Sequence, residues 1–457
     1  MTASSGFAEI KDTTVENLMK RELDTFEANH SRSKEIHDGA DEALLSGVPM
    51  NWMTRWPGAH PVFFDSANGN SLKDVDGNSL IDFCLGDTGA MTGHSPPATV
   101  AAATARIQKG ITTMLPSEDA LPLGQEMVRR FGLAHWQFSL SASDANRFSI
   151  RLCREVTGRD KVIVFNHCYH GSVDETVAML VDGQPSFRVG NIGPPVPIEQ
   201  TTRVVEFNDL EGLREALSHG DVACVLAEPA LTNIGIVLPD PGFLDQLRKL
   251  TRDAGTILII DETHTFCCGP GGYTKAHGLE PDMITIGKPI AGGIPTGAYG
   301  MTDEMAERVL SHTVWEAADV GGVGGTLAGN ALSMAAARAT LEEVLTEENF
   351  EQMISMGERF EKGVQDVIDD HNLAWTVTRL GCRAEYMLGS ERPRSGAEAA
   401  AAFDVPLDAL LHLYMLNRGI LMTPFHMMAL MCPTTSEADV DAHTKVLAEA
   451  AGELTAG

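Results

Sequence analysis

Short, continuous apolar runs separated by helical stretches constrain the fold of this 457-residue chain more than any other feature. Four such runs occupy Val162–Phe165, Val222–Ala227, Ile257–Ile260 and Met283–Ile286. Helical patterns such as residues 210–218 and 242–253 lie between them, and the Pro- and Gly-rich segment 183–197 predicts a long surface loop. Strands covered on both faces read as continuous apolar runs, and they alternate with helices when the sheet is parallel. The pattern therefore predicts an α/β fold with a parallel sheet covered by helices on both faces.

The two ends of the chain indicate a second, smaller α+β domain. The first forty or so residues have a charged helical pattern, and residues 74–78 contain the Asp-Gly pair of a hairpin turn. From Leu327 a helical pattern runs to about His371, and alternating segments follow near residues 375–388 and 420–432. We expect residues 1–75 to form an N-terminal arm and part of the small domain, residues 76–335 the large domain, and residues 336–457 the C-terminal small domain.

Composition excludes several classes of partner. The chain has 63 acidic and 34 basic residues and a formal net charge of −29, which repels nucleic-acid phosphates and anionic lipids. Its apolar runs are too short to span a bilayer, and residues 1–23 lack the apolar stretch of a signal peptide. The eight cysteines form no CxxC pair and no disulfide framework. We expect a cytoplasmic protein with reduced thiols that binds neither nucleic acid nor membranes.

Polar residues follow the apolar runs, at the sheet edge where open α/β folds bind ligands. Glu228 follows the second run, Asp261 and His264 the third, and Lys288 the fourth, while Ser141–Asp144 precedes a helix. Taken singly, these residues are typical of helix caps, salt bridges and solvated side chains.

Two other kinds of site are disfavoured at the same positions. His264 with Cys267 and Cys268 lacks the spacing of zinc ligands, so we expect no metal site. Gly287-Lys288 has no GxxxxGK frame, and Pro289 stands where a phosphate-binding loop requires Ser or Thr.

The joint pattern favours pyridoxal 5′-phosphate as cofactor. A lysine between glycine-containing segments supplies an amine that forms a Schiff base with the cofactor aldehyde. A carboxylate such as that of Asp261 keeps the pyridine nitrogen protonated, and a hydroxyl-rich helix N-terminus takes the phosphate. The chain carries all three parts in Lys288, Asp261 and Ser141–Asp144.

Four motifs resemble the class III pyridoxal-phosphate aminotransferases. They are CYHG (168–171), TILIIDET (256–263), TIGKPIAGG (285–293) and GTLAGN (325–330), in family order. The nearest branch includes glutamate-1-semialdehyde aminomutase and the β-amino-acid transaminases. The resemblance covers about residues 75–340 and implies fold type I, with a mostly parallel seven-stranded sheet in the large domain.

The resemblance implies a role for each matching residue. Lys288 would be the Schiff-base lysine and proton carrier, and Asp261 the partner of the ring nitrogen. Tyr169 matches the aromatic residue that stacks on the ring, although a tyrosine at a strand end also fits core packing. The remaining cofactor contacts would come from Ala142 and Ser143 at the phosphate, Asn233 at the phenolic oxygen, and Thr326 at the phosphate of the neighbouring subunit in a homodimer. Glu228 matches a carboxylate that organises the site.

Some positions depart from the family pattern. Ala142 and Ser143 replace the usual Gly-Thr, and alanine is tolerated unless the glycine needed a positive φ. His264 stands where Met or Gln is common. It would either tune the charge of the ring oxygen or fill space behind the ring.

The substrate pocket is predicted from two segments. Trp52 and Trp56 lie in the N-terminal one, and Phe425, His426 and Met428 lie in the C-terminal one. Met428 falls at or near a glutamate of the aminomutase. An aromatic, Met-lined pocket favours an apolar amine, because an unpaired buried carboxylate is costly, although these residues also fit a protein core. A keto-acid carboxylate could instead be bound by one of four arginines: Arg55, Arg383, Arg392 or Arg394.

These observations predict a transaminase. It would move an amino group from an apolar or aromatic amine, or a β-amino acid, to a keto acid such as pyruvate by a ping-pong mechanism. One alternative is an intramolecular aminomutase of the glutamate-1-semialdehyde type, against which the absent glutamate argues. A second is a non-catalytic protein that keeps the fold for sensing or assembly, which the Lys288 and Asp261 pair disfavours.

Overall fold

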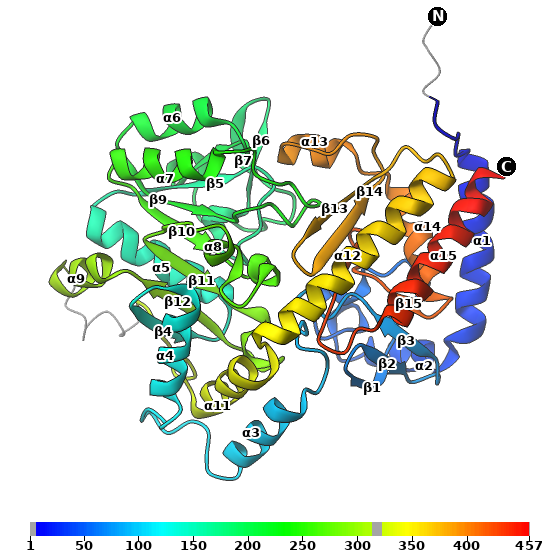
Figure 1. The fold of residues 1–457 in the computed structure, drawn as a ribbon, viewed down its shortest axis with the longest axis horizontal. Helices are drawn as coiled ribbons and strands as arrows, with labels where there is room; N and C mark the ends of the chain where they lie inside the picture. Colours follow the sequence, from blue (N-terminus) through cyan, green and yellow to red (C-terminus); the bar gives the residue numbers. More distant parts are fainter. Residues whose placement is uncertain (1–5, 313–321, 457) are drawn as a thin grey trace, which may run out of the picture. The chain divides into compact units, whose positions relative to one another are not determined.

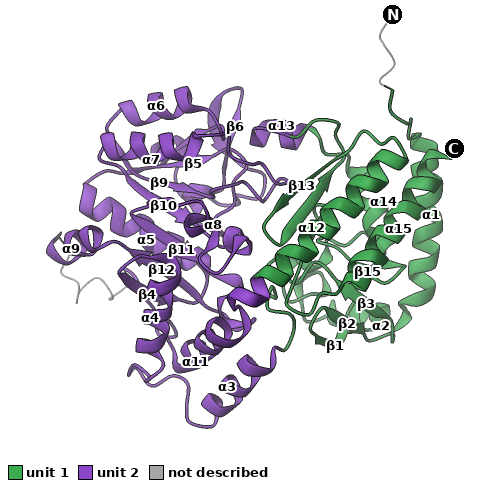
Figure 2. Cartoon of the chain, in the orientation of Figure 1, with its two compact units in different colours: residues 1–95, 351–392, 402–457 green, residues 96–350, 393–401 purple. Residues whose placement is uncertain are grey.

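The computed structural model describes residues 6–312 and 322–456, which form two compact units (Figure 1, Figure 2). Unit 1 comprises residues 1–95, 351–392 and 402–457, and unit 2 comprises residues 96–350 and 393–401. These divisions differ from the predicted boundaries at residues 75 and 335. Residues 76–95 belong with the chain ends because β3 (Ser79–Asp82) pairs with β15 (Ile420–Leu421).

A seven-stranded sheet forms the centre of unit 2, in the order β4-β12-β11-β10-β9-β5-β8. Its strands are β4 (His135–Ser139), β5 (Lys161–Phe165), β8 (Thr202–Val205), β9 (Val222–Ala227), β10 (Ile257–Asp261), β11 (Met283–Ile286) and β12 (Gly297–Met301). Only β12 runs antiparallel to its neighbours in this sheet. The four apolar runs are all strands of it, and every residue of β9, β10 and β11 is buried. The predicted α/β fold with a mostly parallel sheet is confirmed.

Helices surround this sheet. Those of unit 2 are α3 (Pro97–Ile107), α4 (Ala120–Phe131), α5 (Ala142–Thr157), α6 (Leu210–Ser218), α7 (Phe243–Asp253), α8 (Gly272–Ala276), α9 (Asp303–His312), α11 (Ala331–Ala339) and α13 (Gly396–Ala401). Helix α5 packs across β9, β10, β11, β12 and β4, whereas α6 packs on β8 and α7 on β10. Ser141 caps the start of α5 through a hydrogen bond from the Asp144 N–H, and Gly158 ends it at φ 64°.

The predicted surface loop 183–197 is only partly a loop. Residues 184–187 form β7 (Gln184–Phe187), which pairs antiparallel with β6 (Ala178–Val181). Gly183 stands in the turn at φ 74°, a conformation that glycine adopts without strain. The prediction was wrong for these residues because it rested on their proline and glycine content. Proline is tolerated in a strand where no partner needs its N–H, as at Pro185 in this two-stranded sheet.

Unit 1 contains two further sheets. Strands β1 (Phe64–Asn68), β2 (Ser71–Asp74), β3 and β15 form one, and β13 (Thr376–Leu380), β14 (Arg383–Met387) and β16 (Met428–Leu430) form the other. Strands β2 and β3 make the predicted hairpin. The helices are α1 (Asp12–Asn29), α2 (Ser31–Ala40), α12 (Glu347–Asp370), α14 (Val405–Leu416) and α15 (Glu437–Thr455), the first turn of α12 belonging to unit 2. Instead of one helix over 327–371, the chain forms α11, a π-helical turn at Thr340–Val344 and α12. Within the described residues, no helix is long and apolar enough to cross a membrane.

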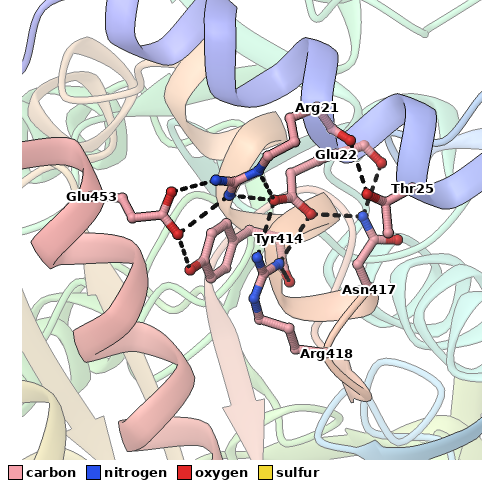
Figure 3. Close-up of polar contacts among 7 residues, drawn as sticks. All are labelled: Arg21, Glu22, Thr25, Tyr414, Asn417, Arg418 and Glu453. Carbon is pink, nitrogen blue, oxygen red and sulfur yellow. Dashed lines mark hydrogen bonds and ion pairs between the residues drawn. The ribbon is translucent and has the colours of Figure 1, made fainter.

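A buried carboxylate joins the N-terminal helix of unit 1 to its C-terminal part (Figure 3). Glu22 of α1 is 1% exposed and accepts two hydrogen bonds from Arg418, at 3.0 and 3.1 Å. Asn417 and Arg21 donate to the same carboxylate at 2.8 and 2.6 Å. Burial by itself raises the pKa of Glu22, but these donors outweigh burial and lower the pKa below its usual value. Glu22 is therefore an ionised anchor for α1.

We expect Arg418→Met to lower the free energy of unfolding by about 3 kcal/mol, because it leaves a buried carboxylate with fewer donors. It also removes the guanidinium that stacks 3.3 Å from the Tyr414 ring centre. Urea denaturation of the full chain measures the change. Arg214→Met is the matched control, since it breaks only the exposed pair with Glu211 and should change stability by about 0.5 kcal/mol or less. Equal effects of the two substitutions would contradict the anchoring role of Glu22.

Candidate active site

Asp261 ends β10 and is held by three donors. Its side chain is 3% exposed. Asn146 Nδ2 and His170 Nδ1 each lie 2.9 Å from Asp261 Oδ2, and the Thr263 N–H donates to Oδ1 at 3.0 Å. Thr285 Oγ1 donates to Asn146 Oδ1 at 2.6 Å, which orients the amide. The carboxylate is therefore fixed in position from α5, from β11 and from the segment after β5.

Asp261 and His170 form a buried ion pair. Burial alone raises the pKa of Asp261, but the hydrogen bonds from His170, Thr263 and Asn146 outweigh it and lower the pKa below the usual range of a carboxyl group. Burial lowers the pKa of His170, but its interactions with Cys168 and Asp261 raise the pKa well above the ordinary value. The carboxylate stays ionised in the interior, as a partner for a protonated ring nitrogen requires.

Lys288 lies at the same edge of the sheet as Asp261. It follows β11, whose Thr285 is the register partner of Asp261 in parallel β10. Its backbone has φ 49°, an uncommon conformation for a residue with a side chain and one that recurs at functional sites. Lys288 Nζ lies 2.8 Å from His264 Nε2, and His264 is 7% exposed. The structure therefore places the lysine, the histidine and the carboxylate, predicted from two strand ends, at one edge of the sheet, with the lysine in contact with the histidine.

The N-terminus of α5 suits a phosphate group. The first amides of a helix have no intrahelical partner, and Ala142 and Ser143 supply two of them. A Cβ at Gly287 would lie 2.8 Å from the Ala142 nitrogen, and one at Gly171 would lie 1.8 Å from Ser143 Oγ. Glycine is thus required at both places for the chain to approach this helix end. Ala142 lies in the first helical turn, where φ is negative, so alanine fits where the family has glycine.

These residues fit pyridoxal phosphate, the cofactor that the sequence resemblance implies. The site comprises an amine, a buried anionic carboxylate and a helix N-terminus, and unit 2 contributes all three. Each matches one chemical part of that cofactor: the aldehyde, the ring nitrogen and the phosphate.

Glu228 organises the segment that carries Tyr169. It is 2% exposed and accepts hydrogen bonds from the Tyr169 N–H at 3.1 Å and from Thr232 Oγ1 at 2.5 Å. Burial raises its pKa. Tyr169 is 38% exposed, so core packing does not account for it. Asn233 donates to the His167 carbonyl at 3.3 Å.

Thr326 of unit 2 lines an open hollow together with Asp144 of helix α5. It is exposed, and the hollow, of about 1700 Å³, is also lined by Arg147 and Tyr299. Its predicted role at the phosphate of a second subunit stays a prediction.

The predicted substrate-pocket residues of unit 1 gather around two aromatic contacts. The Trp52 ring centre lies 5.7 Å from that of Trp56 and 5.7 Å from that of Phe425. His426 Nδ1 lies 2.8 Å from Glu385 Oε1. Glu385 of β14 is the register partner of Met428, and both are buried. A role for this group in binding substrate stays a prediction.

Sequence reasoning missed several partners of the site residues. His170 was quoted only within the CYHG motif, and Asn146, Thr232 and Glu385 were not singled out. Asn146 follows Ala142 by one helical turn, so it faces the same side of α5, which is a signal that helical spacing offers.

We expect His170→Leu to lower the free energy of unfolding by about 3 kcal/mol, because it leaves the Asp261 charge buried with one donor fewer. The lowered pKa of Asp261 gives stability that is present above its unfolded value of about 3.9 and is lost as the pH falls below it. The raised pKa of His170 gives stability that is full below about 6.5 and is lost as the pH rises through the folded value. The difference in free energy of unfolding between the unsubstituted protein and His170→Leu should therefore be largest between about pH 4 and 6.5.

Urea denaturation at pH 5 and pH 9 measures this difference. His219→Leu, at an exposed position, should be close to neutral at both pH values. A His170→Leu effect that does not depend on pH would speak against the ion pair.

Comparison with known proteins shows extensive similarity. Residues 53–450 match the family model described as aminotransferase class III. The chain is 33% identical over 419 residues to glutamate-1-semialdehyde 2,1-aminomutase of Desulfitobacterium hafniense, covering 90% of this chain and 95% of the relative. A crystal structure of a glutamate-1-semialdehyde aminomutase from Pseudomonas aeruginosa PAO1 is 48% identical with TM-score 0.95, over 97% of this chain and 99% of that one. The crystal structure of an omega-transaminase from Sphaerobacter thermophilus is 26% identical with TM-score 0.83, and the match covers 93% of this chain and 98% of that one.

Proposed function

The chain belongs to the class III aminotransferases, an enzyme family that uses pyridoxal 5′-phosphate, and we propose that it moves an amino group between adjacent carbons of one substrate molecule. The observation that supports this proposal is the placement of Lys288 and Asp261 at one edge of the sheet, in a chain 48% identical to a structure that carries the aminomutase name. From the sequence we expected a transaminase, with an aminomutase as the alternative. The similarity favours that alternative.

The bound cofactor supplies an electron-withdrawing ring that stabilises a carbanion next to nitrogen. Lys288 would hold its aldehyde carbon, Asp261 its ring nitrogen, and the amides of Ala142 and Ser143 its phosphate. Tyr169 would lie against the ring.

Two residues of unit 2 would act on protons during the reaction. Asp261, kept anionic by His170 and Asn146, would keep the ring nitrogen of the cofactor protonated. Lys288 Nζ would remove the proton from the substrate carbon that loses the amino group and would supply a proton to the carbon that receives it. Buried Glu228 keeps the Tyr169 segment in place and transfers no proton in this scheme.

The test is turnover of 4-amino-5-oxopentanoate by the purified enzyme with cofactor and with no added keto acid. Formation of 5-amino-4-oxopentanoate at a rate unaffected by pyruvate is expected. Turnover that requires pyruvate and yields alanine would instead establish a transaminase.

A specific observation keeps intermolecular transamination as the second candidate. Met428, which falls at or near a glutamate of the aminomutase, is fully buried. The aromatic side chains Trp52, Trp56 and Phe425, with Trp52 packed against the other two, favour an apolar amine. The amine in this case would be apolar or aromatic, or a β-amino acid, with a keto acid as acceptor. A panel of such amines with and without pyruvate decides between the two functions.

We further infer a homodimer in the cytoplasm. The exposed Thr326 and the exposed apolar side chains Met114, Leu121 and Leu310 around the same hollow support a second copy covering it. Sedimentation equilibrium of the full chain tests the dimer, and a monomer at micromolar concentration would contradict it.

A further inference from the structure

Asn146 lies beside the Asp261 carboxylate, and both of its polar side-chain atoms are hydrogen-bonded. It is fully buried on α5, and its Nδ2 lies 2.9 Å from Asp261 Oδ2 and 3.0 Å from the His170 carbonyl oxygen. Both of these oxygens only accept hydrogen bonds, so the amide nitrogen and its two hydrogens must face them. The amide oxygen therefore faces the buried Thr285 hydroxyl, which donates to it at 2.6 Å.

The donors around Asp261 are unevenly divided between its two oxygens. Oδ2 accepts from the Asn146 amide and from His170 Nδ1, each at 2.9 Å, whereas Oδ1 accepts from the Thr263 N–H at 3.0 Å. Thr263 Oγ1 makes no hydrogen bond within the described residues. Each oxygen of a carboxylate has two lone pairs, so those of Oδ2 are both used and one remains on Oδ1. Oδ1 is therefore the oxygen that can accept a further N–H.

We propose that Asn146 and Thr285 are positioning residues that hold Asp261 so that Oδ1 accepts the N–H of the cofactor ring. The proposal rests on the proposed function, in which Asp261 keeps that ring protonated. Thr285 is the register partner of Asp261 in the neighbouring strand, so the pairing of β10 with β11 sets the spacing of the two residues. The Thr285 hydroxyl fixes the Asn146 amide, and the amide fixes Oδ2.

This role differs from keeping Asp261 ionised. His170 supplies the positive charge of the buried ion pair, and that charge remains when Asn146 is replaced. Asn146 is neutral, and its bond to Oδ2 opposes rotation of the carboxylate about the Cβ–Cγ bond. Rotation would turn Oδ1 away from an incoming N–H, and a hydrogen bond weakens steeply when it is misaligned.

The experiment compares two cofactors by equilibrium dialysis against the full chain. They are pyridoxal 5′-phosphate and its 1-deaza analogue, in which C–H replaces the ring nitrogen. Asn146→Leu removes the amide at similar side-chain size and should raise the Kd of pyridoxal phosphate about tenfold, as for loss of an aligned bond to a charged group. The Kd of the analogue should change by less than about twofold, because it offers no N–H to Oδ1.

The substitutions at Thr285 test the link through Asn146. Thr285→Val should raise the Kd of pyridoxal phosphate about threefold, and Thr285→Ser, which keeps the hydroxyl, should restore it. In an Asn146→Leu background, Thr285→Val should have less than about a further twofold effect, since Thr285 acts only through the amide. Thr202→Val is the matched control, because it removes a buried strand hydroxyl that donates to the Glu175 carbonyl at 2.8 Å. It should change neither Kd.

Equal rises for the two cofactors in Asn146→Leu would show a general disturbance of the site and would overturn the proposal. Full additivity of Asn146→Leu and Thr285→Val would do the same. If Asn146→Leu does not fold, an unchanged Kd in Thr285→Val overturns the proposal by itself. Binding is measured without substrate, so the result does not depend on which amino transfer the enzyme performs. Failure of this proposal and failure of the proposed function are therefore distinguishable.

Discussion

Lys288→Ala is expected to lower the rate of amino transfer by about 10⁴-fold, because it removes the base that takes the proton from the substrate carbon. The amine lies at the sheet edge beside His264, and no second lysine follows any of the strands β9, β10 and β11 at their carboxyl ends. Cofactor binding should persist, since Asp261 and the α5 N-terminus are unchanged. Single-turnover absorbance measurements on the loaded variant report binding and chemistry separately.

Lys249→Ala is the matched control for this variant. Lys249 is exposed on α7 and pairs with Asp253 one helical turn away. Its loss should leave activity within about twofold, as for a surface ion pair. A Lys288→Ala enzyme that retains even a tenth of the activity would show that another group moves the proton.

Asp261→Asn is expected to lower the rate by about 10³-fold, because a neutral amide cannot hold a proton on the ring nitrogen by charge. The fold should be less affected than the activity, since asparagine has nearly the same shape. In the folded, unsubstituted enzyme, the lowered pKa of Asp261 keeps its carboxylate ionised at pH values where an ordinary aspartate would begin to take up a proton. The rate of Asp261→Asn should therefore stay below that of the unsubstituted enzyme down to about pH 5, which lies above the aspartate pKa of about 3.9 in the unfolded chain.

The cofactor spectrum provides a readout independent of turnover. Asp261→Asn should shift the visible band of the bound cofactor, whereas Asp253→Asn, an exposed control on α7, should not. A full-rate Asp261→Asn enzyme with an unshifted band would remove the assigned role of this carboxylate.

Local patterns were sufficient to predict four adjacent strands of the central sheet and the edge at which Lys288 and Asp261 lie. The four apolar runs became β5, β9, β10 and β11 because burial on both faces leaves an unambiguous signal in a parallel sheet. Lys288 and Asp261 follow two of these runs, so strand adjacency alone placed them at one edge.

Contacts between distant segments could not be predicted in the same way. His170 and Asp261 are separated by 91 residues, and their pairing depends on side-chain directions that no local pattern specifies. The boundary of unit 1 depends on β3 pairing with β15, a contact between Ile81 and Ile420. The π-helical turn after α11 is supported by Arg130, whose Nη2 donates to the carbonyls of Leu341 and Leu345 at 2.5 and 2.9 Å.

The shared unit formed by the two chain ends has a consequence for biosynthesis. Residues 96–401, which include all of unit 2, leave the ribosome before α14, β15 and α15 exist. Until then α1 has no Arg418 or Asn417 to satisfy Glu22, and β3 lacks its neighbour from the far end of the chain. The segment up to residue 95 must therefore wait, with the Phe26 side of α1 uncovered, until residues 402–457 are translated.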